Sequence, residues 1–282
     1  MMAGWKRAAM AAGLAAGLAV PVGAQAADLV AVLEAEIVTL DPHFTTAYIS
    51  RTFGYAVYDT LFAPNGKGEI KPQMVGAWTT SDDKLTWRFT LRDGLKFHDG
   101  TPVTANDVVA SLKRWSVRNA LGARLLAVTA SLEAADEKTF VLTLKEPYGL
   151  VLESLGATVG PAPFIIPARL AATPVSQQIT EIVGSGPFIF DRSRHRPGDR
   201  MYLKKNPDYV SRSEPSDFLT GAKTVKIDGL DIRVVPDGAT AAAALQRGEI
   251  DYMQYAPFDL LPSFEKDKRL KVMSFSGSHM FT

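Results

Sequence analysis

The amino-acid sequence predicts a mixed α/β fold, and three observations support this class. First, apolar and polar residues alternate from Leu85 to Leu91, which is the period of a strand with one buried face. Second, Thr104 and Asp107 form a capping-box pattern at the start of an amphipathic segment, which predicts a helix. Third, the predicted strands and helices follow one another without a strict strand–helix–strand repeat, so we expect a mixed sheet.

The first predicted elements run from Asp28 to the capped helix. We expect a strand after Asp28, then a loop, then a helix over about 50–60. The strand at 85–91 is followed by one Asp-Gly pair and a second apolar run at 95–98, which ends at another Asp-Gly pair. Two such runs joined by an Asp-Gly turn predict a hairpin or a strand-turn-strand corner. Along the helix that follows, one face carries Val108, Leu112 and Trp115.

The rest of the chain continues the mixed pattern. Predicted strands cover 139–144, 188–190, 201–204, 225–235 and 270–275, and predicted helices cover 150–155, 239–247 and 258–267. Asp237 is expected to cap the helix at 239–247, because its carboxylate can accept from free backbone N–H groups of the first turn. Gly248 is expected to end that helix, since glycine tolerates the left-handed conformation that follows many helices.

The N-terminus has the composition of an export signal. Lys6 and Arg7 precede an apolar run from Ala8 to Val22, and small residues follow at 24–26. This pattern predicts a signal peptide over 1–26. The alternative is a membrane anchor, but the run is roughly 15 residues long and a spanning helix needs about 20.

Composition excludes several classes of protein. The chain has no cysteine, so it can form no disulfide, no thiolate nucleophile and no lipid-attachment cysteine. With 31 Lys and Arg against 30 Asp and Glu it lacks the basic excess typical of nucleic-acid binding. Hydrophobic residues make up 46% of 282, which is enough for a large core in each of two ordinary domains.

Basic residues concentrate in one place. They are Arg192, Arg194, His195, Arg196, Arg200, Lys204 and Lys205, and they surround a Pro-Gly-Asp turn at 197–199. Charges and turn residues together are typical of a solvated hairpin loop, which is our preferred interpretation. The alternative is a docking patch for a partner.

Catalytic patterns are weak. There is no Gly-x-Ser-x-Gly motif, and Ser185 lies between two glycines with no base close in sequence. The four histidines are too scattered for a local zinc motif. Two acid pairs could imitate a glycosidase, but we place Asp82-Asp83 in a turn and Glu34 with Glu36 on one face of a strand. We therefore expect no enzyme, no cofactor and no metal.

Six separated segments resemble one family. The longest runs from Trp78 to Val108, and the others are 39–42 (TLDP), 58–62 (YDTLF), 184–188 (GSGPF), 206–209 (NPDY) and 236–251, which ends in GEID. In this order they resemble the extracytoplasmic solute-binding proteins of ABC importers in the peptide, oligopeptide and nickel family, solute-binding protein family 5. The resemblance covers nearly all of the chain after the signal.

The resemblance implies a periplasmic binding protein-like fold of two lobes. It assigns 27–64 and 184–282 to a sheet-bearing lobe and 65–183 to an inserted α/β domain, with Gly184-Ser185-Gly186 at the return crossing. Because family members continue for about as many residues again, we expect a fragment that lacks the second ligand-binding lobe. The resemblance also implies a monomer in the periplasm, not lipid-anchored, whose partners are a small solute and the permease subunits of an ABC transporter.

The resemblance also implies a substrate-binding segment. In the family the loop after Leu-Asp-Pro approaches the ligand, which selects His43, Thr45, Thr46 and Tyr48 here. The alternative is an ordinary loop whose aromatic residues pack inward. Asn119 to Gly122 is a second, weaker candidate.

The expected function is capture of peptides or peptide-like solutes for import. Binding of a nickel complex, heme or a sugar is an alternative within the family. A secreted hydrolase and a protein that presents solute to a chemoreceptor are alternatives of other classes.

Overall fold

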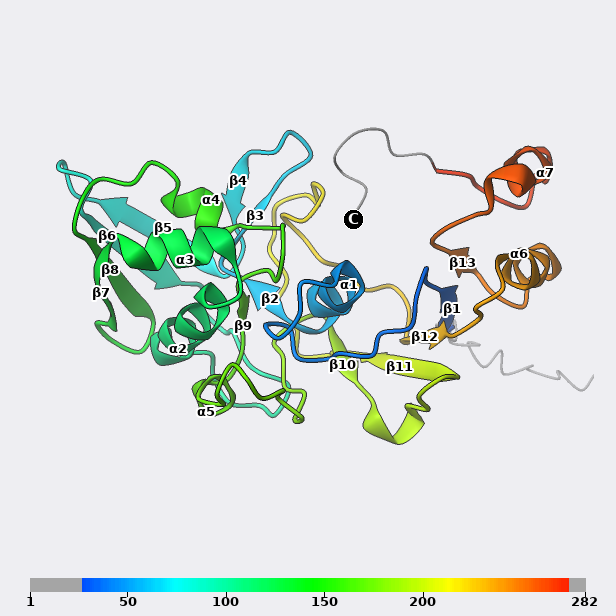
Figure 1. The fold of residues 1–282 in the computed structure, drawn as a ribbon, viewed down its shortest axis with the longest axis horizontal. Coiled ribbons are helices and arrows are strands. Elements are labelled where there is room, and N and C mark those ends of the chain that lie inside the picture. The colour runs from blue at the N-terminus through cyan, green and yellow to red at the C-terminus, as the bar shows by residue number, and fades with distance from the viewer. Residues whose placement is uncertain (1–26, 274–282) are drawn as a thin grey trace, which may run out of the picture.

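The computed structural model describes residues 27–273, so the predicted signal peptide and the end of the predicted strand at 270–275 lie outside the described residues. Figure 1 shows an elongated molecule with one sheet at each end. A five-stranded sheet has the order β10-β11-β12-β1-β13. Its strands are β1 (Leu29–Val32), β10 (Phe188–Phe190), β11 (Arg200–Lys205), β12 (Gly229–Arg233) and β13 (Tyr252–Met253).

This first sheet joins distant parts of the chain. Strand β1 pairs in parallel with both β12 and β13, whereas β10 and β11 continue the sheet antiparallel. Helix α6 (Gly238–Arg247) makes the crossover between β12 and β13, and its buried face packs on Val32 and Ile250. Beyond β13 come η2 (Phe258–Leu260) and α7 (Leu261–Lys266). The parallel strands therefore end together at one edge, beside α6 and α7 (Figure 1).

The second sheet is antiparallel, with the order β5-β6-β8-β7. Its strands are β5 (Val75–Thr80), β6 (Thr86–Leu91), β7 (Thr129–Ala134) and β8 (Thr139–Leu144). Helix α2 (Ala105–Ser116) lies against it, and α3 (Ala120–Ala127) packs on α2 (Figure 1). At the centre Phe89 stacks on Phe140 with ring centroids 4.9 Å apart. Val108, Leu112 and Trp115 of α2 are all buried, as the helical spacing predicts.

Short elements connect the two ends. They are α1 (Tyr48–Val57), β2 (Asp59–Thr60), β3 (Phe62–Pro64), β4 (Ile70–Pro72), α4 (Val151–Leu155), β9 (Phe164–Ile165), α5 (Ala168–Ala171) and η1 (Arg192–Arg194). Strand β2 pairs with β9 and β3 with β4. One continuous apolar cluster runs from α2 through α1 to β10 and β11. The mixed α/β class is therefore confirmed.

Capping signals in the sequence are confirmed. Thr104 accepts from the backbone N–H of Asp107, and the Asp107 carboxylate accepts from the N–H of Thr104 at 2.8 Å, so the capping box is complete. Asp237 accepts from the N–H of Thr240 at 2.7 Å, and Gly248 has a φ of 73° in the left-handed region. These contacts span only three or four residues, so local sequence is enough to predict them.

The predicted hairpin between 85–91 and 95–98 is wrong. Strand β6 pairs instead with β5 and β8. The run at 95–98 forms no strand, and Lys96 makes only an isolated bridge to Pro102 across the second Asp-Gly turn. The apolar residues Leu95 and Phe97 are buried in the core, so tertiary packing explains their alternation.

Several predicted boundaries also need correction. The helix expected at 50–60 is α1, which ends at Val57 because Asp59 and Thr60 pair with β9. The strand expected at 225–235 is confined to β12, and 270–273 is not a strand. Strand β1 ends at Val32, so Glu34 and Glu36 follow the strand and do not share one of its faces.

Two glycines after residue 183 are explained by close packing. A Cβ on Gly184 would lie 1.9 Å from the carbonyl oxygen of Val57, and one on Gly186 would lie 2.6 Å from the carbonyl carbon of Val57. Gly186 also donates its N–H to that carbonyl at 2.9 Å. The segment therefore passes directly over the end of α1, where no side chain fits.

We predict that Thr104→Val destabilises the protein by about 1 kcal/mol, because the hydroxyl acceptor at the N-cap is lost while the shape is kept. Urea denaturation of both proteins measures this difference. Thr104→Ser retains the hydroxyl and serves as the control. Equal midpoints for Thr104→Val and the parent would contradict the role of the cap.

We predict that Gly184→Ala destabilises the protein by more than about 2 kcal/mol, because the added methyl group collides with the backbone of Val57. Gly149→Ala is the matched control, since a Cβ at Gly149 meets no atom within 4 Å. Thermal unfolding of the two variants side by side gives the comparison. A melting temperature for Gly184→Ala no lower than that of the control would show that the crossing can move.

Candidate functional site

The segment 41–48 is fixed from its first residue by a buried ion pair. Arg114 Nη2 of α2 lies 2.7 Å from Asp41 Oδ2, and the side chains are 2% and 0% exposed. The same carboxylate accepts from the N–H groups of His43 and Ile179, both at 2.9 Å. Arg114 also donates to the carbonyls of Thr173 and Gln177. Further hydrogen bonds to both charged groups stabilise such a pair in the interior, although Arg114 Nε has no partner among the described residues.

The side chain of His43, close to this ion pair in the sequence, is also buried. The residue is 1% exposed, and burial lowers the pKa of its imidazole to about 4, although the Asp41 carboxylate acts in the opposite direction. The ring is therefore neutral near pH 7. In the described conformation His43 has almost no surface through which a solute could reach it.

The next residues turn back to the surface. Thr45 is half-buried, and its hydroxyl accepts from the N–H of Ala47 at 3.1 Å. Thr46 is exposed, and Tyr48 is half-buried against the core as the first residue of α1. Of the four predicted residues, His43 is therefore buried, Thr46 is exposed, and Thr45 and Tyr48 are half-buried. Their role in substrate binding stays a prediction.

Helix α1 begins at this surface without a side-chain cap. Its N-cap residue, Ala47, has no side-chain acceptor, so the usual side-chain cap of a helix start is missing here. No acidic residue occupies the first turn. No acidic side chain of the first turn therefore offsets the partial positive charge of the helix start.

A second loop lies beside this start. Arg51 of α1 donates to the carbonyls of Thr158 and Gly160, and Arg118 lies over the ring of Phe44 at 5.1 Å. Val159 at the tip of the loop is 80% exposed. The segments 43–48 and 158–160 are therefore held near each other around the start of α1.

The weaker candidate, Asn119 to Gly122, has a structural role. Asn119 caps α3 by accepting from the N–H of Gly122 at 3.0 Å, and its amide donates to the carbonyls of Val159 and Pro161. Asn119 is itself buried. Its side chain thus positions the second loop.

Three exposed aromatic residues, which no sequence pattern indicated, lie at or just beyond the carboxyl ends of the parallel strands. Tyr252 in β13 and Tyr255 just after it are each 47% exposed, and Phe258 is 86% exposed. Gln254 fixes the end of β13 by donating its N–H to Val32 and by accepting from the N–H of Glu34 at 3.3 Å. Ligands in open α/β sheets bind at this edge, so a parallel pairing of β1 with β13 would have been the signal.

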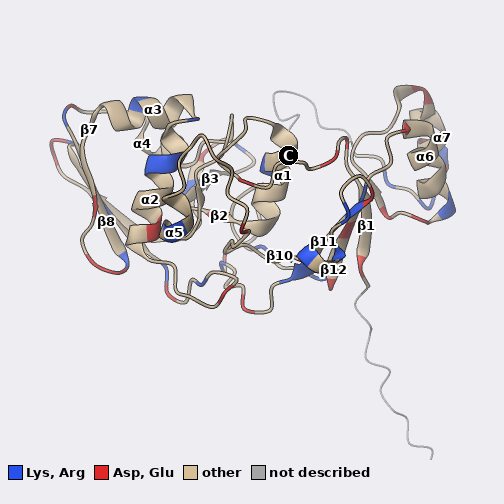
Figure 2. Cartoon of the chain, turned by 60° about the horizontal axis from the view of Figure 1, so that its bottom comes forward, with Lys and Arg blue, Asp and Glu red and all other residues tan. Residues whose placement is uncertain are grey.

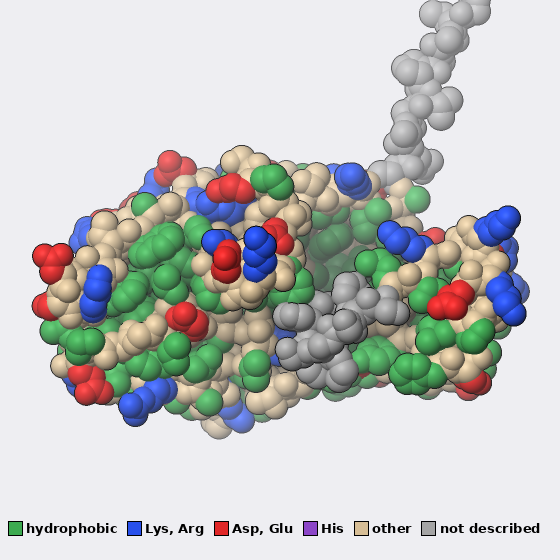
Figure 3. Space-filling view, turned by 90° about the horizontal axis from the view of Figure 1, so that it is seen from above, with side chains coloured by type: hydrophobic (Ala, Val, Ile, Leu, Met, Phe, Trp, Pro, Cys, Tyr) green, Lys and Arg blue, Asp and Glu red, His purple; other side chains and the backbone are tan. Residues whose placement is uncertain are grey.

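Figure 3 shows a hollow in the surface between the two ends of the molecule, with hydrophobic side chains around it. Elsewhere on the described surface, Thr46 exposes a hydroxyl group and Tyr255 exposes an aromatic ring. These groups suit reversible binding of a small polar solute with apolar parts.

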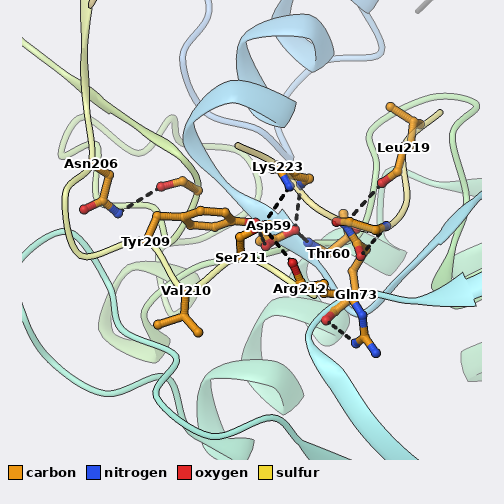
Figure 4. Close-up of polar contacts among 12 residues, drawn as sticks. Asp59, Thr60, Gln73, Asn206, Tyr209, Val210, Ser211, Arg212, Leu219 and Lys223 are labelled. Carbon is orange, nitrogen blue, oxygen red and sulfur yellow. Dashed lines mark hydrogen bonds and ion pairs between the residues drawn. The ribbon is translucent and has the colours of Figure 1, made fainter. Parts of the chain in front are cut away.

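A second buried carboxylate holds the connection between the two ends. Asp59 of β2 accepts from Tyr209 Oη and Lys223 Nζ, each at 2.9 Å, and from the N–H of Thr60 at 3.0 Å (Figure 4). Burial and the Asp59 charge raise the pKa of Tyr209, so this phenol stays protonated and donates. The network ties the 206–223 loop to β2.

The same loop is also tied to the second sheet. Arg212 donates to the carbonyls of Gln73 and Val75 at 3.0 and 3.1 Å, and Gln73 exchanges hydrogen bonds with Gly221 (Figure 4). The long connection between β11 and β12 is thus bonded along its length to β2 and to the start of β5.

Metal and catalytic groups do not gather in the described part of the chain. Within residues 27–273 no three His, Asp or Glu side chains lie close enough to hold a metal ion. Ser185 is buried, and no partner is seen for its hydroxyl among the described residues. None of the helices in this range is long and apolar enough to cross a membrane.

Comparisons with known proteins agree with this picture. The family model described as "Bacterial extracellular solute-binding proteins, family 5 Middle" matches residues 69–282. The chain is 45% identical over 271 residues to "Probable peptide ABC transporter periplasmic-binding protein y4tO" of Sinorhizobium fredii, covering 93% of this chain and 50% of that protein. It is 30% identical to "Glutathione-binding protein GsiB" of Shigella flexneri serotype 5b, covering 94% and 49%.

Solved structures give the same result. The PBP AgaA from A. tumefacien R10, in complex with agropinic acid, superposes with a TM-score of 0.70 at 29% identity, over 86% of this chain and 46% of that one. The oligopeptide-binding protein AppA from Bacillus subtilis also reaches 0.70, at 24% identity over 88% and 47%, and shows the fold alone. The chain spans about half the length of the curated relatives it matches.

We predict that Arg114→Met destabilises the protein by about 3–5 kcal/mol, because the Asp41 carboxylate is left buried without its counter-ion. Arg247→Met, which breaks an exposed pair with Glu249, is the control and should cost no more than about 1 kcal/mol. Guanidinium denaturation measures both. Similar losses in the two variants would show that the Asp41–Arg114 pair does not anchor the segment.

Proposed function

This chain belongs to the bacterial extracellular solute-binding proteins of family 5, and from that membership we propose that it captures peptides or peptide-like solutes in the periplasm. It then acts as the substrate-binding subunit of an ABC transporter and delivers the solute to the membrane permease. The observation that carries the proposal is the 45% identity to a peptide-transport binding protein over 93% of this chain.

The solute class follows from the relatives and from the surface. GsiB is named for binding glutathione, and AgaA was solved with agropinic acid. The proposed site combines the hydroxyl of Thr46, the uncapped start of α1 and the ring of Tyr255. The helix start suits a carboxylate and the aromatic ring suits an apolar side chain, so we favour an amino-acid-derived solute over a sugar or heme.

The division of the chain is part of this proposal. Strand β1 pairs with strands after residue 184, and the second sheet is built wholly from residues 75–144. These pairings support one lobe from 27–64 and 184–282, with 65–183 inserted. They also support binding by closure, in which the solute is gripped from a second side.

Family 5 and the matched relatives are solute-binding proteins and not enzymes. We extend this to the present chain, which binds its solute without altering it. A secreted hydrolase is the competing class, and the mass of the bound compound separates the two.

We predict that the gene product, purified without refolding, carries a peptide or peptide-like compound in stoichiometric amount. Native mass spectrometry identifies the compound. Incubation of the same compound with the protein should leave its mass unchanged. Release of a cleaved product at catalytic turnover would favour the hydrolase.

Two variants locate the site once that solute is known. Tyr255→Ala should weaken binding about tenfold, as expected for loss of an aromatic contact, and Thr46→Val should weaken it by about twofold to tenfold, because one hydrogen bond is lost. Thr79→Val, on the exposed surface of β5, is the control. Affinities equal to the control in both variants would place the site elsewhere.

A further inference from the structure

An Asn-Gly pair, Asn65-Gly66, lies in the turn between β3 and β4. Asparagine followed by glycine can react with itself and water, because glycine has no side chain to keep its backbone nitrogen from the neighbouring amide. In this reaction the nitrogen of Gly66 bonds to Cγ of Asn65, and the Cγ–Nδ2 bond breaks. The amide group leaves as ammonia with the proton of the Gly66 N–H, and water opens the cyclic imide to aspartate or isoaspartate.

Hydrogen bonds fix the leaving group, Asn65, which is only 6% exposed. Its Oδ1 accepts from the N–H groups of Lys67 and Glu69 at 3.0 and 2.9 Å, and its Nδ2 donates to Glu69 Oε2 at 3.1 Å. The N–H of Asn65 also donates to the carbonyl of Glu69, and its carbonyl accepts from the N–H of Gly68, each at 2.9 Å. Ammonia can leave only if the bond from Nδ2 to Glu69 breaks.

A residue far along the chain binds the attacking group. The N–H of Gly66 donates to Asp217 Oδ1 at 2.9 Å, across 151 residues of sequence. Asp217 belongs to the long connection between β11 and β12, and Figure 1 shows a loop of this connection beside the β3–β4 turn. A hydrogen bond from an N–H group to a carboxylate is stronger than one to a neutral acceptor. As long as this bond lasts, the nitrogen is held away from Cγ of Asn65.

The position of Asp217 does not depend on Gly66 alone. Asp217 and Thr220 exchange backbone hydrogen bonds at 2.9 and 3.0 Å, which closes the turn at 217–220. Gly221 donates its N–H to Gln73 Oε1 at 3.2 Å and accepts from Gln73 Nε2 at 3.4 Å. Removal of the Asp217 carboxylate would therefore free the N–H of Gly66 and leave the other bonds of the turn in place.

The products would disturb the turn. A carboxylate at position 65 would stand where the amide now donates to Glu69, and Glu69 is itself paired with Lys71 at 3.0 Å. Figure 2 shows acidic and basic positions of both signs along the loops, so one new charge there acts on near neighbours. Isoaspartate would also lengthen the backbone by a methylene group, and the turn could not keep all its hydrogen bonds.

We propose that Asn65-Gly66 is a latent deamidation site, and that Asp217 keeps it unreactive by binding the N–H of Gly66. The reaction then occurs only when the 217–220 turn separates from the β3–β4 turn, and its rate reports that separation. The inference is independent of the proposed solute site, because the two share no residue.

Peptide mapping by mass spectrometry, after incubation of the folded gene product in mildly alkaline buffer, tests the proposal. Asn65 should persist in the parent protein. Asp217→Ala should form aspartate and isoaspartate at position 65 at least about fivefold faster, as expected when one hydrogen bond is lost. Asp217→Asn keeps an oxygen acceptor and should restore most of the protection. Asp259→Ala removes an exposed carboxylate elsewhere and should behave like the parent.

A second asparagine in the same peptide map separates local opening from unfolding. Asn106 is exposed in the first turn of α2 and has no part in the proposed contact. Faster conversion of Asn65 alone in Asp217→Ala supports the proposal, whereas an equal rise at Asn106 points to general unfolding and overturns it. Slower conversion in both Asp217 variants would mean that the carboxylate acts as a base for the Gly66 nitrogen. That result, or equal rates in the parent and Asp217→Ala, also overturns the proposal.

Discussion

The ion pair between Asp41 and Arg114 is the interaction on which the candidate site depends. It joins the segment before α1 to a helix of the second sheet, and both side chains are almost fully buried. Removing two charges from water is costly, and hydrogen bonds with backbone groups around 173–179 offset part of that cost. These bonds leave the chain little freedom between Asp41 and α1, and the outward position of Thr46 follows from them.

A second buried carboxylate plays the corresponding part at the connection between the two ends. Asp59 accepts three hydrogen bonds. Two come from Tyr209 and Lys223, which are 150 and 164 residues away, and the third comes from its neighbour Thr60. Gly184 and Gly186 let the segment before β10 lie against the end of α1, and together with Asp59 they help to hold the relative position of the two sheets. A binding protein needs such a rigid frame, because a preorganised surface avoids the entropy cost of ordering the site when solute binds.

How much could be read from the sequence depended on the range of the interaction. Thr104, Asp237 and Gly248 act within a few residues of themselves, and each was predicted correctly. The expected hairpin at 85–98 failed because β6 finds its partners at 75–80 and 139–144, and no local signal specifies such pairing. The sequence does not indicate the positions of the exposed Tyr252 and Tyr255 for the same reason. They lie at the carboxyl edge of the sheet only because β13 pairs in parallel with β1, more than 200 residues away. Within the predicted segment, local sequence does not show that His43 is buried. The ion pair that fixes its neighbour Asp41 in the interior joins residues 73 positions apart.

The charged groups near the proposed solute site have partners in the protein. Asp41 and Arg114 pair with each other, Arg51 donates to backbone carbonyls, and Arg118 lies over the ring of Phe44. The contacts proposed for the solute are instead a hydroxyl, an aromatic ring and backbone dipoles. Such groups bind weakly one by one, and affinity there must come from desolvation when the solute is enclosed from a second side.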